Sequence, residues 1–99
     1  MEIIKINKDD SMIYEISGSI DSRTAPDFEA ELIPELDNYN TAVLDFSNVK
    51  YISSAGMRVL LMGHKKAKAA GGKLSIAYVP SFVMEIFDVT GFSNNLDFI

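Results

Sequence analysis

The segment AVLDFSNVKYISSAGMRVLL, residues 42–61, joins two apolar elements through a polar stretch. TAVLDFS, residues 41–47, has the length and composition of a buried central strand, and residues 48–52 are interpreted as a connection. A helical spacing follows at Met57, Leu60, Leu61 and His64. The segment therefore predicts a strand–loop–helix unit with two adjacent serines, Ser53 and Ser54, at the start of the helix.

The sequence after this unit predicts the remaining elements of the chain, from the end of the helix to the C-terminus. Gly71 and Gly72 predict the end of the helix. Residues 73–79 predict a strand with one face formed by Leu74, Ile76 and Tyr78. Pro80 opens a short helix, whose buried side is expected to be Phe82 or Val83, Ile86 and Phe87. Residues 94–99 are expected to form a last short strand or an extended tail.

The N-terminal part predicts a β-hairpin and then a helix. Alternating apolar residues flank a turn cluster at residues 8–11. Thr24 is placed to cap the following helix, with Pro26 in its first turn. Pro34 removes a backbone donor within this helix and predicts a kink or break. An apolar stripe marks the buried side of the helix at Phe28, Leu32 and Leu36.

The order of the predicted elements is strand–strand–helix–strand–helix–strand–helix–strand. Such alternation is typical of α/β domains with right-handed crossovers. We therefore expect a single α/β domain over residues 1–99, with helices packed against a mixed, mostly parallel sheet of four to five strands. The N-terminal β-hairpin is expected to add the antiparallel edge.

Composition restricts the possible classes of function. Apolar residues make up 47% of the 99, which supports one core. Cysteine is absent and there is one histidine, so neither disulfides nor a zinc site is expected. The net charge of −5 disfavours nucleic acid as a partner. We expect no signal peptide, because the N-terminus lacks a long apolar stretch, and no apolar run approaches the roughly 18 residues of a membrane span. We expect a cytoplasmic domain.

Motifs for catalysis are missing from the sequence. Ser53 and Ser54 follow an isoleucine, whereas the nucleophile elbow G-x-S-x-G needs a glycine there. No phosphate-binding GxxxxGK[ST] loop occurs. His64 lies among lysines and is interpreted as a surface or boundary residue. The chain is expected to be neither an enzyme nor dependent on a cofactor.

The two serines allow two interpretations. A helix start leaves backbone N–H groups without partners, and serine is well suited to cap them. Alternatively, one hydroxyl faces solvent at the carboxyl edge of the sheet, where helix N–H groups and the helix dipole tolerate negative charge. A phosphoryl group there would add about −1.5 to −2 charges without unfolding the domain.

The chain resembles the STAS domain family, the sulfate-transporter and anti-sigma-factor-antagonist domains. The resemblance covers nearly the whole chain and rests on GSID (18–21), AVLDFSNVKYISSAGMRVLL (42–61), AKAAGGKLSIAYV (67–79) and VMEIFDVTGF (83–92). A chain of this length is most similar to the bacterial anti-sigma factor antagonists. The resemblance implies that a kinase-fold anti-sigma factor binds around the loop and helix. That partner then phosphorylates a serine or threonine of the loop, and a serine/threonine phosphatase resets the switch.

The family's loop is typically Asp-Ser-[Ser/Thr/Ala]-Gly. Aligned on Gly56, Ser53 takes the aspartate position, Ser54 the first hydroxyl position and Ala55 the second. The resemblance thus implies Ser54 as the phosphorylation site, with Ser53 as the fallback. It also implies a partner-binding surface of Asp21, Ser53, Ala55, Gly56, Met57 and Arg58.

Several of these residues have other interpretations. Asp21 either lies near the phosphorylation loop or caps the helix that follows it. Met57 is a partner contact or a core residue. Arg58, one turn after Ser54, either binds a partner carboxylate or a phosphate, or is solvated. Two other functions stay open: a structural STAS subunit docked without phosphorylation on a transporter ATPase or other partner complex, and a small-ligand or nucleotide-binding module that uses the helix N-terminus as an anion site.

Overall fold

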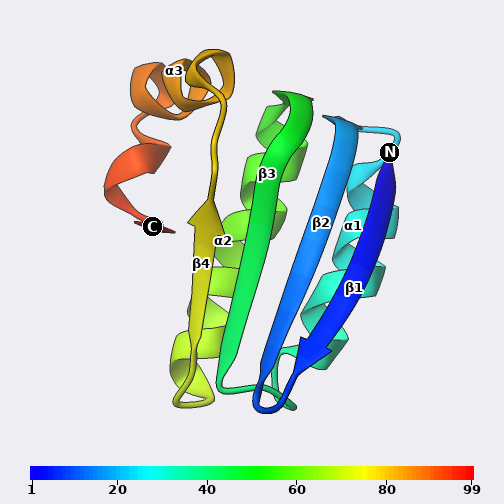
Figure 1. Ribbon diagram of the computed structural model, residues 1–99. Helices are drawn as coiled ribbons and strands as arrows, with labels where there is room; N and C mark the ends of the chain where they lie inside the picture. The colour runs from blue at the N-terminus through cyan, green and yellow to red at the C-terminus, as the bar shows by residue number, and fades with distance from the viewer.

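The computed structural model describes all residues, 1–99, and has two layers (Figure 1). A five-stranded sheet has the order β1-β2-β3-β4-β5, with α1 and α2 packed behind it in the view of Figure 1. Only β1 runs antiparallel to its neighbour. The predicted α/β class and mostly parallel sheet are confirmed. The elements are β1 Glu2–Lys8, β2 Ser11–Ile20, α1 Ala25–Leu32, η1 Ile33–Glu35, β3 Thr41–Ile52, α2 Ser54–Ala69, β4 Lys73–Ala77, α3 Ser81–Thr90, η2 Phe92–Asn94 and β5 Asp97–Phe98.

The N-terminal hairpin forms as expected. β1 and β2 pair from Glu2↔Ser17 to Lys8↔Ser11, and Asp9 takes a positive φ of 56° in the turn. Aspartate tolerates this left-handed conformation better than most residues. Alternate residues of β2 face the helices and are buried at Met12, Tyr14 and Ile16.

The first helix breaks where the sequence predicted. α1 ends at Leu32, and the 3₁₀ turn η1 carries Pro34. Because proline lacks an N–H, the α-helical hydrogen bonds cannot continue through it. The expected stripe is confirmed by the burial of Phe28, Leu32 and Leu36.

The third strand is longer than expected. Residues 48–52, interpreted as a connection, belong to β3. They remain in the sheet because β2 continues beside them, with Ser17 opposite Asn48 and Ile20 opposite Ile52. Two register shifts accompany this pairing and break the alternation of buried residues. Residues 48–52 therefore lack the alternating pattern that is typical of a strand, although their pairing with β2 continues.

The second helix ends at the two glycines. The N–H of Gly71 donates to Lys68 O at 3.1 Å, and that of Gly72 to Ala67 O at 2.8 Å. This is the Schellman arrangement, and the φ of +82° at Gly71 explains the glycine there. The helix faces the sheet through Gly56, Met57, Val59, Leu60, Gly63 and Ala67. Leu61 and His64, expected on this stripe, are only half-buried.

The predictions for β4 and α3 need two corrections. β4 ends at Ala77, and Tyr78 is not on the buried face of a strand but 73% exposed. It leaves the sheet because β3 pairs with β4 only as far as Ala77, and β5 only as far as Ile76. In α3, Val83 and not Phe82 is buried. Ile86 is half-buried, Phe87 is fully buried, and residues 97–98 form the expected last strand. None of the helices combines the length and apolarity needed to cross a membrane.

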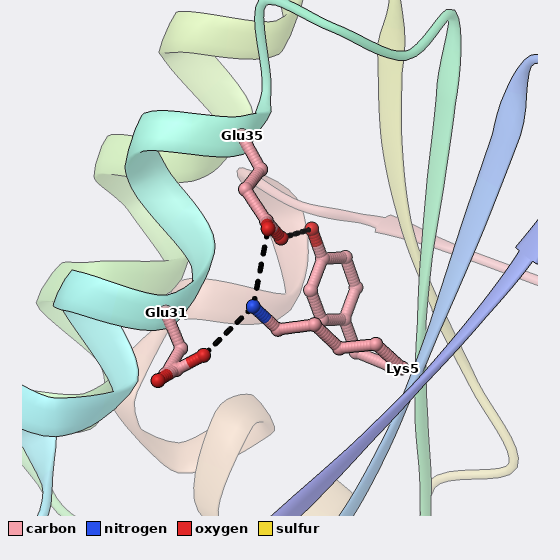
Figure 2. A network of polar contacts seen from close by, with 4 residues as sticks. Lys5, Glu31 and Glu35 are labelled. Carbon is pink, nitrogen blue, oxygen red and sulfur yellow. Dashed lines mark hydrogen bonds and ion pairs between the residues drawn. The ribbon is translucent and has the colours of Figure 1, made fainter.

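A polar network ties the hairpin to the first helix (Figure 2). Lys5 Nζ lies 2.7 Å from Glu31 Oε2 and 3.1 Å from Glu35 Oε2. The hydrogen bond with Glu31 contributes most to raising the pKa of Lys5. Tyr14 Oη donates to Glu35 Oε1 at 2.7 Å. Burial first, and then the Glu35 carboxylate, raises the pKa of Tyr14 far above its usual range, so the phenol stays a donor.

Substituting Tyr14 with phenylalanine is expected to lower the free energy of unfolding by about 1 to 2 kcal/mol. The ring remains in the core, but the Glu35 carboxylate loses a donor that lies out of bulk water. Urea unfolding of both proteins measures the difference. Tyr51→Phe is the control, because that tyrosine is exposed and its removal should change stability by less than about 0.5 kcal/mol. Equal effects of the two substitutions would contradict the prediction.

Candidate functional site

The two adjacent serines have different roles at the junction of β3 and α2. Ser53 is extended, at φ −94° and ψ 175°, and its hydroxyl accepts the N–H of Gly56 at 3.5 Å. Its own N–H donates to Ile20 O at 2.8 Å. Ser54 is the first residue of the helix, and its side chain is exposed. The expectation that one serine caps the helix is confirmed for Ser53, and Ser54 offers its hydroxyl to solvent.

The residues after Ser54 hold the helix against the sheet. A Cβ on Gly56 would lie 2.7 Å from Ile20 Cγ2, 2.8 Å from Ile52 Cγ1 and 3.1 Å from Ile20 O. Met57 is 3% exposed and belongs to the core, whereas Ala55 is half-buried. Gly56 and Met57 therefore set the position of the helix start, and neither presents a side chain at the surface.

Asp21 organises the loop that precedes α1. Its Oδ1 accepts the N–H of Arg23 at 2.9 Å and that of Thr24 at 3.2 Å. The hydrogen bond from Arg23, followed by that from Thr24, lowers the pKa of the Asp21 carboxyl. The loop lies next to Ser53, because Ile20 accepts the N–H of Ser53. Asp21 thus shapes its own loop, and it directly follows Ile20, the residue that is hydrogen-bonded to Ser53.

Thr24 does not cap the helix with its side chain, contrary to the expectation. Its backbone is already helical, at φ −97° and ψ −19°. The hydroxyl instead donates to Ser19 O at 2.9 Å and accepts the N–H of Asp21 at 2.9 Å. The threonine therefore fastens the loop to the end of β2, which steadies the backbone next to Ser53.

The electrostatic surroundings of Ser54 favour a negatively charged group. The first turn of α2 contains no acidic residue. The free N–H groups and the dipole of this 16-residue helix favour an anion at its start. Arg58 lies one turn further along and is exposed. A phosphoryl group on Ser54 would thus meet favourable local electrostatics and no buried surroundings.

The structure also brings α3 to this site, which the sequence did not indicate. Thr90 Oγ1, at the end of α3, lies 3.6 Å from Met57 Sδ in the first turn of α2. Figure 1 shows α3 at the same end of the molecule as the start of α2. His64 lies further along α2, with Nδ1 3.7 Å from Asp97 Oδ2. No short-range sequence signal links residues 78–90 to Ser54, because the link depends on strand order.

Comparison with known proteins places the chain in a family. The STAS domain model matches residues 2–99. The chain is 34% identical over 91 residues to BtrV of Bordetella bronchiseptica, named as a candidate anti-sigma factor antagonist, covering 90% of this chain and 78% of BtrV.

Solved structures share the fold. The structure of a candidate anti-sigma factor antagonist from Thermotoga maritima superposes with a TM-score of 0.87 at 20% identity, covering 97% of this chain and 84% of that one. The Bacillus protein SpoIIAA in its phosphorylated form gives 0.76 at 12% identity, covering 99% and 91%. The five-stranded sheet, the capped serine junction and the family match over residues 2–99 lead to one conclusion: this chain belongs to the STAS domain family.

Proposed function

We propose that this chain is an anti-sigma factor antagonist that captures a kinase-fold anti-sigma factor and is released by phosphorylation of Ser54. The observation that carries the proposal is the division of roles between the two serines. Ser53 is engaged as the helix cap, while the Ser54 hydroxyl is exposed at the start of α2. A kinase needs an accessible hydroxyl, and Ser54 meets this requirement without any unfolding.

The relatives support the same proposal. BtrV is named as a candidate anti-sigma factor antagonist, and SpoIIAA has been solved in a phosphorylated form. In our proposal the unmodified surface around Ser54 binds the anti-sigma factor, and the sigma factor is freed. The added dianion then repels the bound partner, and a serine/threonine phosphatase restores the hydroxyl. The chain itself is the substrate of this cycle.

The surface proposed for this contact contains the exposed residues Ser54 and Arg58, the half-buried residues Asp21, Ser53 and Ala55, and the backbone around Gly56. Met57 lies beneath this surface and supports it. Arg58 would bind a partner carboxylate in the complex, or the phosphoryl group after transfer.

Incubation with ATP and each purified kinase-fold anti-sigma factor of the source organism tests the proposal. One of them is expected to add a single phosphoryl group to Ser54, located by mass spectrometry of the peptide that contains residues 51–57. Ser54→Ala should abolish the modification, whereas Ser53→Ala should retain it. Modification of Ser53 alone would reassign the acceptor, and no modification by any candidate kinase would reject the switch.

A second function is favoured by one feature of the loop. Ser53 stands where the family's loop has an aspartate, so the site lacks an acidic side chain at that position. A STAS subunit docked on a transporter ATPase would not need this aspartate. Absence of phosphorylation, together with co-purification of a transporter ATPase with the tagged chain, would decide for this function.

A further inference from the structure

One face of the sheet, which we call the open face, is not covered by a helix. Figure 1 shows α1 and α2 behind the sheet and no helix in front of β1, β2 or β3. The four strands β2 to β5 run parallel to one another. Parallel sheets occur almost only with both of their faces covered. The open face is therefore the largest part of this fold that still lacks a packing partner.

The middle of the open face is a band of branched apolar side chains. Strand pairing places Ile6 beside Ile13, and Ile13 beside Val43. These three residues are half-buried, whereas their neighbours along β2 and β3 are buried under the helices. Ile4, two residues before Ile6 on the edge strand, is 58% exposed. A contiguous apolar band on a protein surface is typical of an interaction site.

Charged residues of opposite sign border the two sides of this band. Glu15 on β2 is paired with Asp45 on β3, and these two form the acidic row. Lys8 and Lys73 lie at the two ends of another row across β1 to β4, the basic row. None of the four makes an ion pair within the chain. Four residues along each strand separate the two rows by about 13 Å, so they do not neutralise each other.

The acidic row in particular calls for a positively charged partner. Like charges that lie directly opposite each other on paired strands destabilise a sheet. The carboxylate of Asp45 accepts the N–H of Ser47 at 2.9 Å, and that of Glu15 has no hydrogen bond. A surface that carries lysines beside an apolar band would compensate these charges, and the chain itself has such a surface in its basic row.

From these observations we infer that the open face binds a second copy of this chain, with the two sheets face to face and their strands antiparallel. A twofold axis along the apolar band places the Ile13 side chains of the two copies against each other. It also places the basic row of each copy opposite the acidic row of the other. Lys8 then lies one strand, about 4.8 Å, to the side of Glu15 of the second copy. Lys73 lies equally close to Asp45 of the second copy, so both acids gain a lysine partner.

This dimer does not depend on the proposed function and does not obstruct it. α2 lies on the covered face of the sheet, so Ser54 of each copy stays exposed. Because the strands of the two copies are antiparallel, the two Ser54 residues lie at opposite ends of the dimer. Each of them can be reached by a partner of its own.

Sedimentation equilibrium of the chain alone, from about 10 μM to 1 mM, tests the inference over the range of weak dimers. The wild type is expected to dimerise. Glu15→Lys and Lys8→Glu should each weaken the dimer by about 10-fold or more, because like charges then meet at both equivalent contacts. An equimolar mixture of these two variants should dimerise as the wild type does, since each changed charge meets its opposite on the other chain. Asp45→Lys and Lys73→Glu form a second pair with the same expectations.

Glu85→Lys is the matched control, because it makes the same change of charge at an exposed residue of α3, outside the open face. It should dimerise as the wild type does, and circular dichroism checks that every variant is folded. A wild type that stays monomeric over the whole range would leave the open face to a different partner and overturn the inference. Dimers that persist in all the single variants, or mixtures that dimerise no better than their components, would show that the copies meet elsewhere and would also overturn it.

Discussion

Ser54→Asp is expected to weaken binding of the anti-sigma factor by about 100-fold, which corresponds to about 2.7 kcal/mol. The substitution places a negative charge at the exposed start of α2, where the unmodified surface has none. Burying this charge against a partner costs its hydration, and any acidic group of the partner repels it. The fold should tolerate the change, because an anion at a helix N-terminus is favourable.

Calorimetric titration of the variant with the anti-sigma factor measures this loss, and thermal unfolding checks that the domain is intact. Asn38→Asp is the matched control, since it adds one negative charge at an exposed residue before β3, whereas Ser54 follows the other end of that strand. Exposed charges so far apart are screened by salt, so binding of this control should remain within about 3-fold of wild type. Equal loss in both variants would mean that net charge, and not the Ser54 position, controls the complex.

Gly56→Ala is expected to lower the free energy of unfolding by about 2 to 3 kcal/mol and the melting temperature by roughly 10 to 20 °C. A Cβ at this position would lie 2.7 Å from Ile20 Cγ2 and 3.1 Å from the Ile20 carbonyl oxygen. The β-branched side chains of Ile20 and Ile52 are fully buried, and their Cγ atoms cannot move aside without repacking. The start of α2 would have to shift away from the sheet.

Circular dichroism during heating and in urea measures the change, and Gly63→Ala is its control in the same helix. There the new Cβ would meet Leu74 Cδ2 at 2.9 Å, the end of a side chain that can rotate. The gain in helix propensity from glycine to alanine, about 1 kcal/mol, offsets that contact. Gly63→Ala should therefore stay within about 1 kcal/mol of wild type. A Gly56→Ala protein as stable as the wild type would refute the close approach of helix and sheet.

Many element boundaries were predictable because their causes are local. Pro34 ends α1, Gly71 ends α2 in the left-handed conformation, and the turn before Ser11 needs only short polar residues. Period-two alternation on β2 and the helical stripe of α1 each report one buried face. These signals depend on neighbours within a few residues, so they can be identified without knowing the fold.

The sequence-based predictions were wrong where the structure of a segment depends on elements that are distant in the sequence. Residues 48–52 are a strand because β2 lies beside them, and Tyr78 leaves the sheet because its neighbours have stopped pairing. The choice of Val83 over Phe82 as the buried residue depends on how α3 packs against Phe46 and Phe98. No property of residues 78–83 alone distinguishes these alternatives.

The sequence by itself determined that a capped helix follows an apolar strand. It also determined that one of two equivalent serines must accept a hydrogen bond from a free N–H group at the start of this helix. Capping chemistry is local, so the pattern was sufficient for this. Which serine stays exposed was decided by tertiary structure. The N–H of Ser53 is held by Ile20 on the neighbouring strand, and Gly56 lets the helix start lie against Ile20 and Ile52. This docking turns Ser53 inward as the cap and leaves Ser54 at the surface.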